Sequence, residues 1–511
     1  MLELHTPSQA ASWLRSRVTG TLHSDSRELR AGDGFIAWPG AASDARQYVA
    51  QALVRGASAC LVEKTGVAAY GFGDPRVAAY EQLKGASGDI AAAYFDQPSQ
   101  QIKLLAVTGT NGKTSTVWWL AQALSTLKQV APVPCAMVGT LGIGRPPVVQ
   151  TTGLTTPDPV LLQKALREFV DTGVQACAIE ASSIGLVEQR LQGCRVHSAV
   201  FTNFTQDHLD YHGSMRAYWQ AKMQLFSWPG LRSAIVNVDD PKGLELLDVL
   251  GRTALDIWTV SCSSPARLQA CDISCETRGL RFTVCERGGE GVVSKAESQV
   301  LQTGLIGLYN VSNLLGVLAA MRSIGVPLAA AVEACADLAP VPGRMEFAGA
   351  QGQTLVAVDY AHTPDALGQA LRALRPVSAQ RGGKLWCVFG CGGDRDAGKR
   401  PLMGAVAASH ADQVLVTSDN PRGEKPETII SQILLGLSGH RHVAVEPDRA
   451  RAIALVLAQA APADVVLLAG KGHEDYQEVA GQRLAFSDLD HVRRLQSLPL
   501  AQRVTEEELH G

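Results

Sequence analysis

The chain lacks any long apolar run. No stretch of its 511 residues approaches the roughly 20 consecutive apolar residues that a membrane span requires, and the first 30 residues hold no apolar core of signal-peptide length. Neither sign of charge is in excess, since 46 Lys and Arg face 49 Asp and Glu. These absences speak against bulk attraction to nucleic acid or membrane. We therefore expect a cytoplasmic protein with no membrane insertion.

Cysteine motifs are also lacking. The 11 cysteines are scattered through segments that have strand and helix patterns, so we expect reduced thiols. Cys271, Cys275 and Cys285 come nearest to a metal spacing, but the segment from Asp272 to Val284 has the pattern of a hairpin. A closed structural zinc site needs four ligands at tighter pairing, so a hairpin without metal is the favoured interpretation.

Length and pattern predict an α/β protein of three domains. Residues 1–98 have the pattern of a small N-terminal α/β domain. Residues 99–339 repeatedly place polar residues at the ends of apolar runs, as expected for a central P-loop-type ATPase domain with a mainly parallel sheet. Residues 340–511 repeat strand, loop and helix, which is typical of a Rossmann-like doubly wound domain.

A glycine-rich loop organises the central segment. It lies between an apolar strand pattern over 102–107 and a helical pattern over 114–127. Gly109 and Gly112 let the backbone approach a polyphosphate, Lys113 would reach its β and γ phosphates, and the Thr114 hydroxyl would hold Mg²⁺. The loop is two residues shorter than the usual phosphate-binding motif. The alternative is a glycine turn with a solvated lysine.

Two further polar side chains follow apolar strand patterns. Glu180 follows the run 174–179, and His208 comes shortly after the run 198–201. Because the carboxyl ends of parallel strands line one crevice, both side chains should gather near the glycine loop, where they suit a divalent cation. His208 taken alone could equally be a capped loop histidine. Lys222, on a predicted helix that Ser214 caps, would by itself be an ordinary solvated lysine.

The remaining candidates could bind a base and an amino acid. Asn310 and Asn313 lie three residues apart on one predicted helical face, where their amides could meet a base or act as caps. In the last segment, residues 392–396 with Asn420 and Arg422 put charge and glycine where a zwitterionic substrate could be held. Surface turns are the alternative for each of these taken singly.

Together these motifs resemble the Mur ligases, the ATP-dependent amide-bond-forming enzymes of peptidoglycan precursor synthesis. The matching segments are 108–114, 180–183, 202–203, 207–212, 218–222, 309–313 and 343–346. Segments 359–365 and 389–396 and the Asp-Asn-Pro-Arg of 419–422 are similar to the members that add meso-diaminopimelate. The resemblance implies an ADP-forming ligase that joins meso-2,6-diaminopimelate to the D-glutamate γ-carboxylate of UDP-N-acetylmuramoyl-L-Ala-D-Glu through an acyl phosphate.

The resemblance also implies a role for individual residues. ATP would contact Gly109, Thr110, Asn111, Gly112, Lys113, Thr114, Asn313, Arg344 and Asp359. Mg²⁺ would lie among Thr114, Glu180, His208 and Lys222 as a carbamate, and of these Glu180, His208 and Lys222 join Lys113 as the catalytic residues. The N-terminal domain would help bind the UDP-sugar peptide, with contacts at Ser26, Thr155, Thr156, Ser182 and Arg190. Diaminopimelate would meet Arg395, Asp419, Asn420, Pro421, Arg422, Gly470 and Glu474 in the C-terminal domain.

Three departures and three rival interpretations accompany the resemblance. Leu154 and Ile184 stand where relatives often carry asparagine and histidine, and Ala-Ala-Ser at 41–43 replaces a more polar run, which bears on the UDP-sugar contacts. A lysine-adding ligase and a folylpolyglutamate synthetase are disfavoured by Arg395 and the 419–422 motif, because diaminopimelate has the extra carboxylate that arginines would bind. A non-catalytic nucleotide-binding protein is disfavoured by the intact catalytic set. We expect a monomer that binds small-molecule substrates, with closure of its third domain as a gate.

Overall fold

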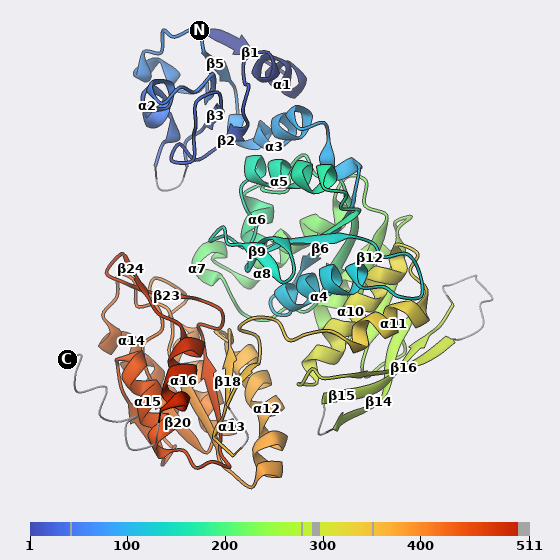
Figure 1. The fold of residues 1–511 in the computed structure, drawn as a ribbon, viewed down its shortest axis with the longest axis vertical. Helices are drawn as coiled ribbons and strands as arrows, with labels where there is room; N and C mark the ends of the chain where they lie inside the picture. Colours follow the sequence, from blue (N-terminus) through green and yellow to red (C-terminus); the bar gives the residue numbers. More distant parts are fainter. Residues whose placement is uncertain (41–42, 277–278, 289–296, 350–351, 499–511) are drawn as a thin grey trace.

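The computed structural model describes residues 1–40, 43–276, 279–288, 297–349 and 352–498, so the first two residues of the 41–43 run lie outside the described ranges. They form three lobes, each built around its own α/β sheet (Figure 1). A two-stranded sheet of β23 (Tyr476–Val479) and β24 (Gln482–Ala485) accompanies the third lobe. The predicted fold class is confirmed.

The N-terminal lobe is a five-stranded parallel sheet of order β1-β5-β4-β3-β2. Successive strand residues point to opposite faces, so Phe35 and Ile36 enter different apolar clusters. Both are fully buried. The elements are β1 (Leu2–Leu4), α1 (Pro7–Arg15), β2 (Leu22–His23), β3 (Gly34–Ala37), α2 (Val49–Val54), β4 (Ala59–Glu63), β5 (Val77–Tyr80) and α3 (Leu83–Tyr94).

The central lobe holds an eleven-stranded mixed sheet of order β16-β15-β14-β13-β12-β11-β6-β10-β7-β8-β9. Its middle is parallel and buried on both faces, which explains the continuous apolar runs of its strands. Antiparallel strands extend both ends, including the hairpin predicted around Asp272 to Val284. The strands are β6 (Lys103–Thr108), β7 (Cys135–Gly139), β8 (Gly142–Arg145), β9 (Val148–Gln150), β10 (Ala176–Glu180), β11 (Val196–Phe201), β12 (Ser233–Asn237), β13 (Asp256–Ser261), β14 (Leu268–Glu276), β15 (Gly279–Glu286) and β16 (Glu297–Thr303).

Helices cover both faces of the central sheet, and polar side chains cap the N-termini of several of them. Ser214 caps α8 (Met215–Met223) by accepting from the Ala217 amide, as predicted, and Asp158 caps α5 (Pro159–Asp171) just before a proline. One apolar cluster includes α4 (Lys113–Ser125), α10 (Tyr309–Ser323) and α11 (Leu328–Ala336). The other face carries α5 (Pro159–Asp171), α6 (Ser183–Val187), α8 (Met215–Met223) and α9 (Pro241–Leu250), with the short α7 (Leu209–His212) at the sheet's carboxyl edge.

The C-terminal lobe is a six-stranded sheet of order β17-β18-β22-β19-β20-β21, parallel except for β17. Helices on both faces make it doubly wound, with two separate apolar clusters. Its strands are β17 (Glu346–Ala348), β18 (Leu355–Asp359), β19 (Leu385–Phe389), β20 (Gln413–Val416), β21 (Val443–Val445) and β22 (Val465–Ala469). Its helices are α12 (Pro364–Arg381), α13 (Lys399–His410), α14 (Pro426–Leu434), α15 (Arg449–Gln459) and α16 (Asp488–Ser497).

Two expectations about absent features can be compared with the described part of the chain. All eleven cysteines are free thiols, and no group of three or more His, Cys, Asp and Glu side chains is arranged to hold a metal among the residues described. Within the same ranges, no helix combines the length and apolar character needed to cross a bilayer.

Candidate active site

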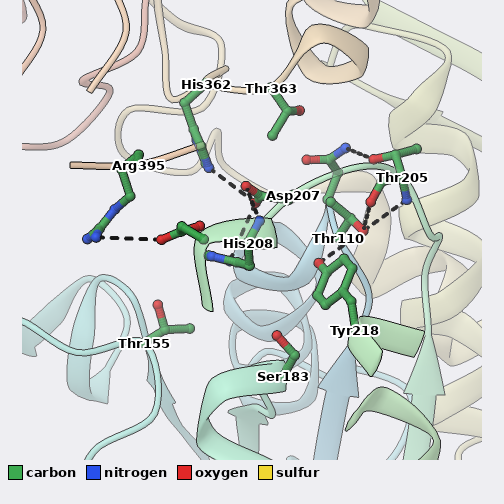
Figure 2. Close-up of polar contacts among 12 residues, drawn as sticks. Thr110, Thr155, Ser183, Thr205, Asp207, His208, Tyr218, His362, Thr363 and Arg395 are labelled. Atoms are coloured by element: carbon green, nitrogen blue, oxygen red, sulfur yellow. Dashed lines mark hydrogen bonds and ion pairs between the residues drawn. The ribbon is translucent and has the colours of Figure 1, made fainter. Parts of the chain in front are cut away.

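The glycine loop connects β6 to α4 and has the backbone geometry that its glycines allow. Gly109 and Gly112 have φ of 144° and 85°, which L side chains rarely adopt. A Cβ at Gly112 would lie 2.3 Å from the Asn313 Oδ1 atom. The Thr110 hydroxyl donates to the Thr205 carbonyl at 3.1 Å, which anchors the loop to the chain after β11 (Figure 2). The loop therefore exposes its backbone to a ligand while its tip is held.

Two lysines meet at the carbonyl of Gly109. Lys113 Nζ donates to it at 3.0 Å and to the Thr110 carbonyl at 2.8 Å. Lys222 Nζ donates to the same Gly109 oxygen at 2.7 Å, and the Lys222 side chain is only 1% exposed. Burial lowers the pKa of both amines, and the nearby Lys113 lowers the pKa of Lys222 further. The two amines lie so close together that a bound anion would stabilise their protonated forms.

Glu180 ends β10 and is fully buried beside the start of α4. The Thr114 hydroxyl donates to Glu180 Oε2 at 3.1 Å, and the Thr140 amide donates to Oε1 at 2.8 Å. The structure thus brings together Thr114 and Glu180, which the strand-end pattern had placed in one crevice. Their oxygens are donors of the type that Mg²⁺ prefers.

His208 occupies a left-handed backbone position, with φ of 52°, at the start of α7. Its Nε2 lies 3.4 Å from Asp207 Oδ2, and Asp207 also lies 3.7 Å from Nε2 of His362 in the C-terminal lobe (Figure 2). Burial lowers the pKa of His208 to about 4, so its imidazole is neutral at neutral pH and able to bind a metal. Asp207 and His362 link the two lobes at this point.

A cavity of about 490 Å³ lies between the central and C-terminal lobes. Asn111, Gly112, Asn313, Arg344 and Asp359, all predicted to contact ATP, are among its lining residues. The Arg344 guanidinium donates to the Thr114 hydroxyl at 3.1 Å, and its buried Nε has no partner among the described groups. Burial raises the pKa of Asp359, whose carboxylate accepts from the Met345 amide at 2.8 Å. The cavity therefore offers an unpaired guanidinium donor close to the glycine loop.

Side chains from three loops of the C-terminal lobe converge near Gly392. A Cβ at Gly392 would lie 2.8 Å from Arg422 Nη1 and 3.7 Å from Arg395 Cγ, so the two predicted arginines flank this glycine. Asn420 Nδ2 donates to Glu474 Oε2 at 2.8 Å. A Cβ at Gly470 would lie 2.2 Å from Asp419 Oδ2, so those two loops pack closely, and the Gly393 amide donates to the Asn420 carbonyl next to Pro421. The seven predicted residues thus gather at the carboxyl end of this sheet.

Four of the five residues predicted to meet the UDP-sugar peptide lie together on the central lobe. Thr156 donates to the Glu180 carbonyl at 2.7 Å and lies 3.0 Å from the Ser182 hydroxyl, and Arg190 Nη1 donates to the Thr156 carbonyl at 2.9 Å. Thr155 lies 3.1 Å from the Thr140 hydroxyl. Ser26 belongs to the N-terminal lobe, where its carbonyl accepts from Arg55, and follows β2, which packs against α5.

Comparisons with known proteins agree with this geometry. Residues 107–321 match the family model of the Mur ligase middle domain, and residues 343–472 match that of the Mur ligase, glutamate ligase domain. The chain is 62% identical over 493 residues, 96% of its length and 97% of the relative's, to the UDP-N-acetylmuramoyl-L-alanyl-D-glutamate--2,6-diaminopimelate ligase of Acidovorax sp. (strain JS42). The chain belongs to the Mur ligase family.

Further relatives extend the likeness of this Mur ligase. The ligase of the same name from Pseudomonas aeruginosa is 43% identical over 94% of the chain and 95% of its own length. A solved structure of a UDP-N-acetylmuramoyl-L-alanyl-D-glutamate--2,6-diaminopimelate ligase shares 36% identity with a TM-score of 0.61, covering 94% of this chain and 95% of its own. MurF from Thermotoga maritima in complex with ADP, at 19% identity and a TM-score of 0.65 over 95% and 99%, shows the fold alone.

Several residues of this Mur ligase site were missed by sequence reasoning. Thr140 holds both Glu180 oxygens, and the Asn111 amide donates to Asp365 Oδ2 of the C-terminal lobe at 3.0 Å. Lys471 is fully buried between Asn420 and Glu474. Lys471 could have been found from the sequence, because it lies three residues before Glu474 in a loop that follows a strand. Thr140 and Asp365 could not, because their contacts join segments that are far apart in the chain.

Proposed function

We propose that this chain is an ATP-dependent ligase that adds meso-2,6-diaminopimelate to the D-glutamate γ-carboxylate of UDP-N-acetylmuramoyl-L-Ala-D-Glu in peptidoglycan precursor synthesis. The observation that carries the proposal is the 62% identity, over 96% of the chain, to a ligase named for that reaction. The arginines that flank Gly392 support the choice of amino acid, because a second carboxylate needs a second guanidinium partner. The substrates are small molecules, and we propose a cytoplasmic monomer.

We assign the residues to three domains, with boundaries near residues 98 and 339. The N-terminal domain with Ser26, and the neighbouring Thr155, Thr156, Ser182 and Arg190, hold the UDP-sugar peptide. Gly109 to Thr114 bind the ATP phosphates, with Asn313 at the base, Asp359 at the ribose and Arg344 at the phosphates. The C-terminal domain binds diaminopimelate through Arg395, Asp419, Asn420, Pro421, Arg422, Gly470 and Glu474.

Mg²⁺ fits the donors that surround the glycine loop. Thr114 and Glu180 offer oxygens, and neutral His208 offers nitrogen. A Lys222 ammonium would repel the ion, whereas a carbamate on this buried, low-pKa amine would be an anionic oxygen ligand. When bound, the ion would neutralise charge that develops on the transferred phosphoryl group.

In the first step, an oxygen of the D-glutamyl γ-carboxylate forms a bond to the γ-phosphorus of ATP, the bond to the ADP oxygen breaks, and an acyl phosphate results. Lys113 Nζ donates to the Gly109 and Thr110 carbonyls in this structure. With ATP bound, it would donate to the phosphates instead and stabilise their negative charge. The neutral amine of diaminopimelate then attacks the acyl carbon to form the carbon–nitrogen bond, phosphate leaves with the electron pair of the broken carbon–oxygen bond, and one proton of the nitrogen is released to the phosphate or to water. Glu474 and Asp419 orient the amino acid, while Arg395 and Arg422 hold its carboxylates.

One assay tests the proposal. The purified chain with ATP, Mg²⁺ and UDP-N-acetylmuramoyl-L-Ala-D-Glu is expected to release phosphate when meso-diaminopimelate is added, and far less with L-lysine or with no amino acid. Phosphate release with L-lysine but not with meso-diaminopimelate would refute the choice of substrate. No ATP turnover with any amino acid would refute the ligase and favour a nucleotide-binding protein.

A further inference from the structure

Arg449, the first residue of α15, is buried and makes four hydrogen bonds outside any pocket described above. It is 1% exposed, and its partner Asp488, at the start of α16, is fully buried. Arg449 Nε and Nη2 donate to Asp488 Oδ1 and Oδ2, each at 2.7 Å. Nη1 donates to the Ser418 carbonyl at 3.2 Å, and Nη2 donates to the Ala469 carbonyl at 2.9 Å. A single guanidinium therefore joins two helix starts and two strand ends.

The two carbonyls belong to the residues that introduce the proposed amino-acid-binding loops. Ser418 directly precedes the loop 419–422, and Ala469 directly precedes the loop 470–474. The loops follow β20 and β22, which are not sheet neighbours, because β19 lies between them. Backbone pairing between β20 and β22 cannot set the spacing of the loops where they begin. Farther along, the Arg422 backbone pairs with Glu478 and Ala480, so the Arg449 guanidinium is the tie across β19 at the start of the two loops.

The spacing of these loops decides whether the substrate-facing side chains meet. Asn420 Nδ2 donates to Glu474 Oε2 at 2.8 Å, so one loop orients the carboxylate of the other. Lys471 Nζ, fully buried, donates to Asn420 Oδ1 at 3.2 Å and to Glu474 Oε2 at 3.1 Å. A shift of either loop by an ångström would break this triangle, because such bonds weaken steeply beyond about 3.5 Å.

Stability alone does not account for an ion pair at this position. The desolvation of two buried charges offsets most of their attraction, and apolar side chains of similar volume often serve a fold as well or better. The planar fork of arginine is instead suited to holding several acceptors in fixed directions. The four acceptor atoms of Arg449 are the two Asp488 carboxylate oxygens, which orient it, and the two carbonyl oxygens that lead into the loops.

We propose that Arg449 and Asp488 are positioning residues for the incoming amino acid: without touching it, they fix the separation of the loops 419–422 and 470–474 and so set the affinity for diaminopimelate. The inference rests on the proposed function and deepens it. The glycine loop, Glu180 and Lys222 belong to the central lobe. Among the described residues, Arg449 donates to Asp488, Ser418 and Ala469 and not to Arg344 or Asp359, the proposed ATP contacts of its own lobe, so we expect the pair to act on the nucleophile side of the reaction.

The test replaces the pair by apolar side chains of similar volume, as Arg449→Met with Asp488→Leu. We expect KM for meso-diaminopimelate to rise by about tenfold or more, as when hydrogen bonds to a substrate lose their geometry. KM for ATP and for the UDP-dipeptide should stay within about twofold, and kcat at saturating amino acid should fall little. Arg449→Lys keeps the positive charge but not the planar guanidinium group. It should therefore raise the KM for meso-diaminopimelate and leave the other two KM values unchanged.

A control ion pair lies at the other end of the strands of the same sheet, where its two side chains are 41% and 40% exposed. Arg375 Nη1 donates to Asp412 Oδ2 at 2.6 Å, and Asp412 accepts from the Leu385 amide at the start of β19. Arg375→Met with Asp412→Leu removes an ion pair of the same lobe at the amino ends of the strands. We expect all three KM values to remain within about twofold of the parent enzyme.

Hydrogen exchange gives a readout that does not depend on turnover. In the Arg449→Met and Asp488→Leu variant, amides of 419–424 and 470–475 should exchange faster, while those of the central lobe keep their protection. An unchanged KM for diaminopimelate, an equal rise in all three KM values, or unchanged exchange in both loops would overturn the proposal. If the parent enzyme fails to use diaminopimelate, the proposed function fails, and the exchange result still decides whether the pair positions the loops.

Discussion

At the scale of the residue, Lys222 carries the most specific chemistry. It is almost fully buried, donates to the Gly109 carbonyl and lies 4.3 Å from the centre of the Tyr218 ring. Burial, together with the charge of Lys113, holds its pKa well below the usual range. A larger fraction of the amine is therefore neutral at neutral pH than for a solvated lysine, and a neutral amine is the form that adds to carbon dioxide.

The first prediction concerns this amine. With isotopically labelled bicarbonate, the carbon NMR spectrum of the parent enzyme should show a carbamate signal that Lys222→Met lacks, and phosphate release by the variant should fall by about a hundredfold or more. The control Lys242→Met removes a half-exposed lysine that pairs with Glu245, and it should keep both signal and rate. A carbamate signal that persists in Lys222→Met, or full activity of that variant, would contradict the assignment.

At the scale of the element, the sequence patterns predicted most of what the structure shows. Apolar runs gave β6, β10, β11 and β22 because parallel strands are buried on both faces, and the Ser214 cap gave the start of α8. The helix that Ser214 caps ends at Met223, and the chain continues as a 3₁₀ turn over Gln224–Ser227. The central sheet has more antiparallel strands at its ends than expected.

Contacts between distant segments were the part that sequence could not supply. Arg449 and Asp488 are 39 residues apart, and Asp207 and His362 come from different lobes, so neither pair leaves a periodic or spaced pattern. Glu180 and His208 were recognisable because they follow strands, whereas Lys222 and Arg190 were named only through the family resemblance. Their partners depend on which strands become neighbours, and that order is a property of the packed sheet.

A second prediction belongs to the glycine loop. Gly112→Ala places a side chain on a backbone with φ of 85° and puts its Cβ 2.3 Å from Asn313 Oδ1. We therefore expect the free energy of unfolding to fall by about 1–3 kcal/mol and the KM for ATP to rise by about tenfold. Gly173→Ala, with φ of 77° and no neighbour within 4 Å, is the control. It should cost similar stability, measured by urea unfolding, with an unchanged KM for ATP. Equal KM values for ATP in the two variants would refute the idea that the clash with Asn313 weakens ATP binding.

At the scale of the whole molecule, the central and C-terminal lobes touch around the candidate site. Asn111 donates to Asp365 at 3.0 Å, Gln206 donates to Asp396 at 3.0 Å, and Arg344 reaches Thr114. All three contacts involve residues within or next to predicted binding segments. The relative placement of the lobes and the geometry of the site are therefore linked, as expected if closure of the C-terminal domain is a gate.

The third prediction of this section removes two of these contacts. Asp365→Ala with Asp396→Ala should favour separated lobes by about 1 kcal/mol, since each exposed polar contact contributes a fraction of that. X-ray scattering should show a larger radius of gyration without ligands, and one closer to that of the parent when all substrates are present. Asp171→Ala, which removes only a pair with Arg167 within α5, should leave the radius unchanged. Equal radii for the parent and the double variant would argue against the linkage.

The glycine loop and the proposed magnesium donors follow strands of the central lobe, whereas the residues proposed to select the amine follow β19, β20 and β22 of the last lobe. The last lobe also contributes Arg344 and Asp359 to the cavity beside the glycine loop. A different amine could therefore be accepted after changes in a few loops of the last lobe, while the glycine loop and its magnesium donors stay unchanged.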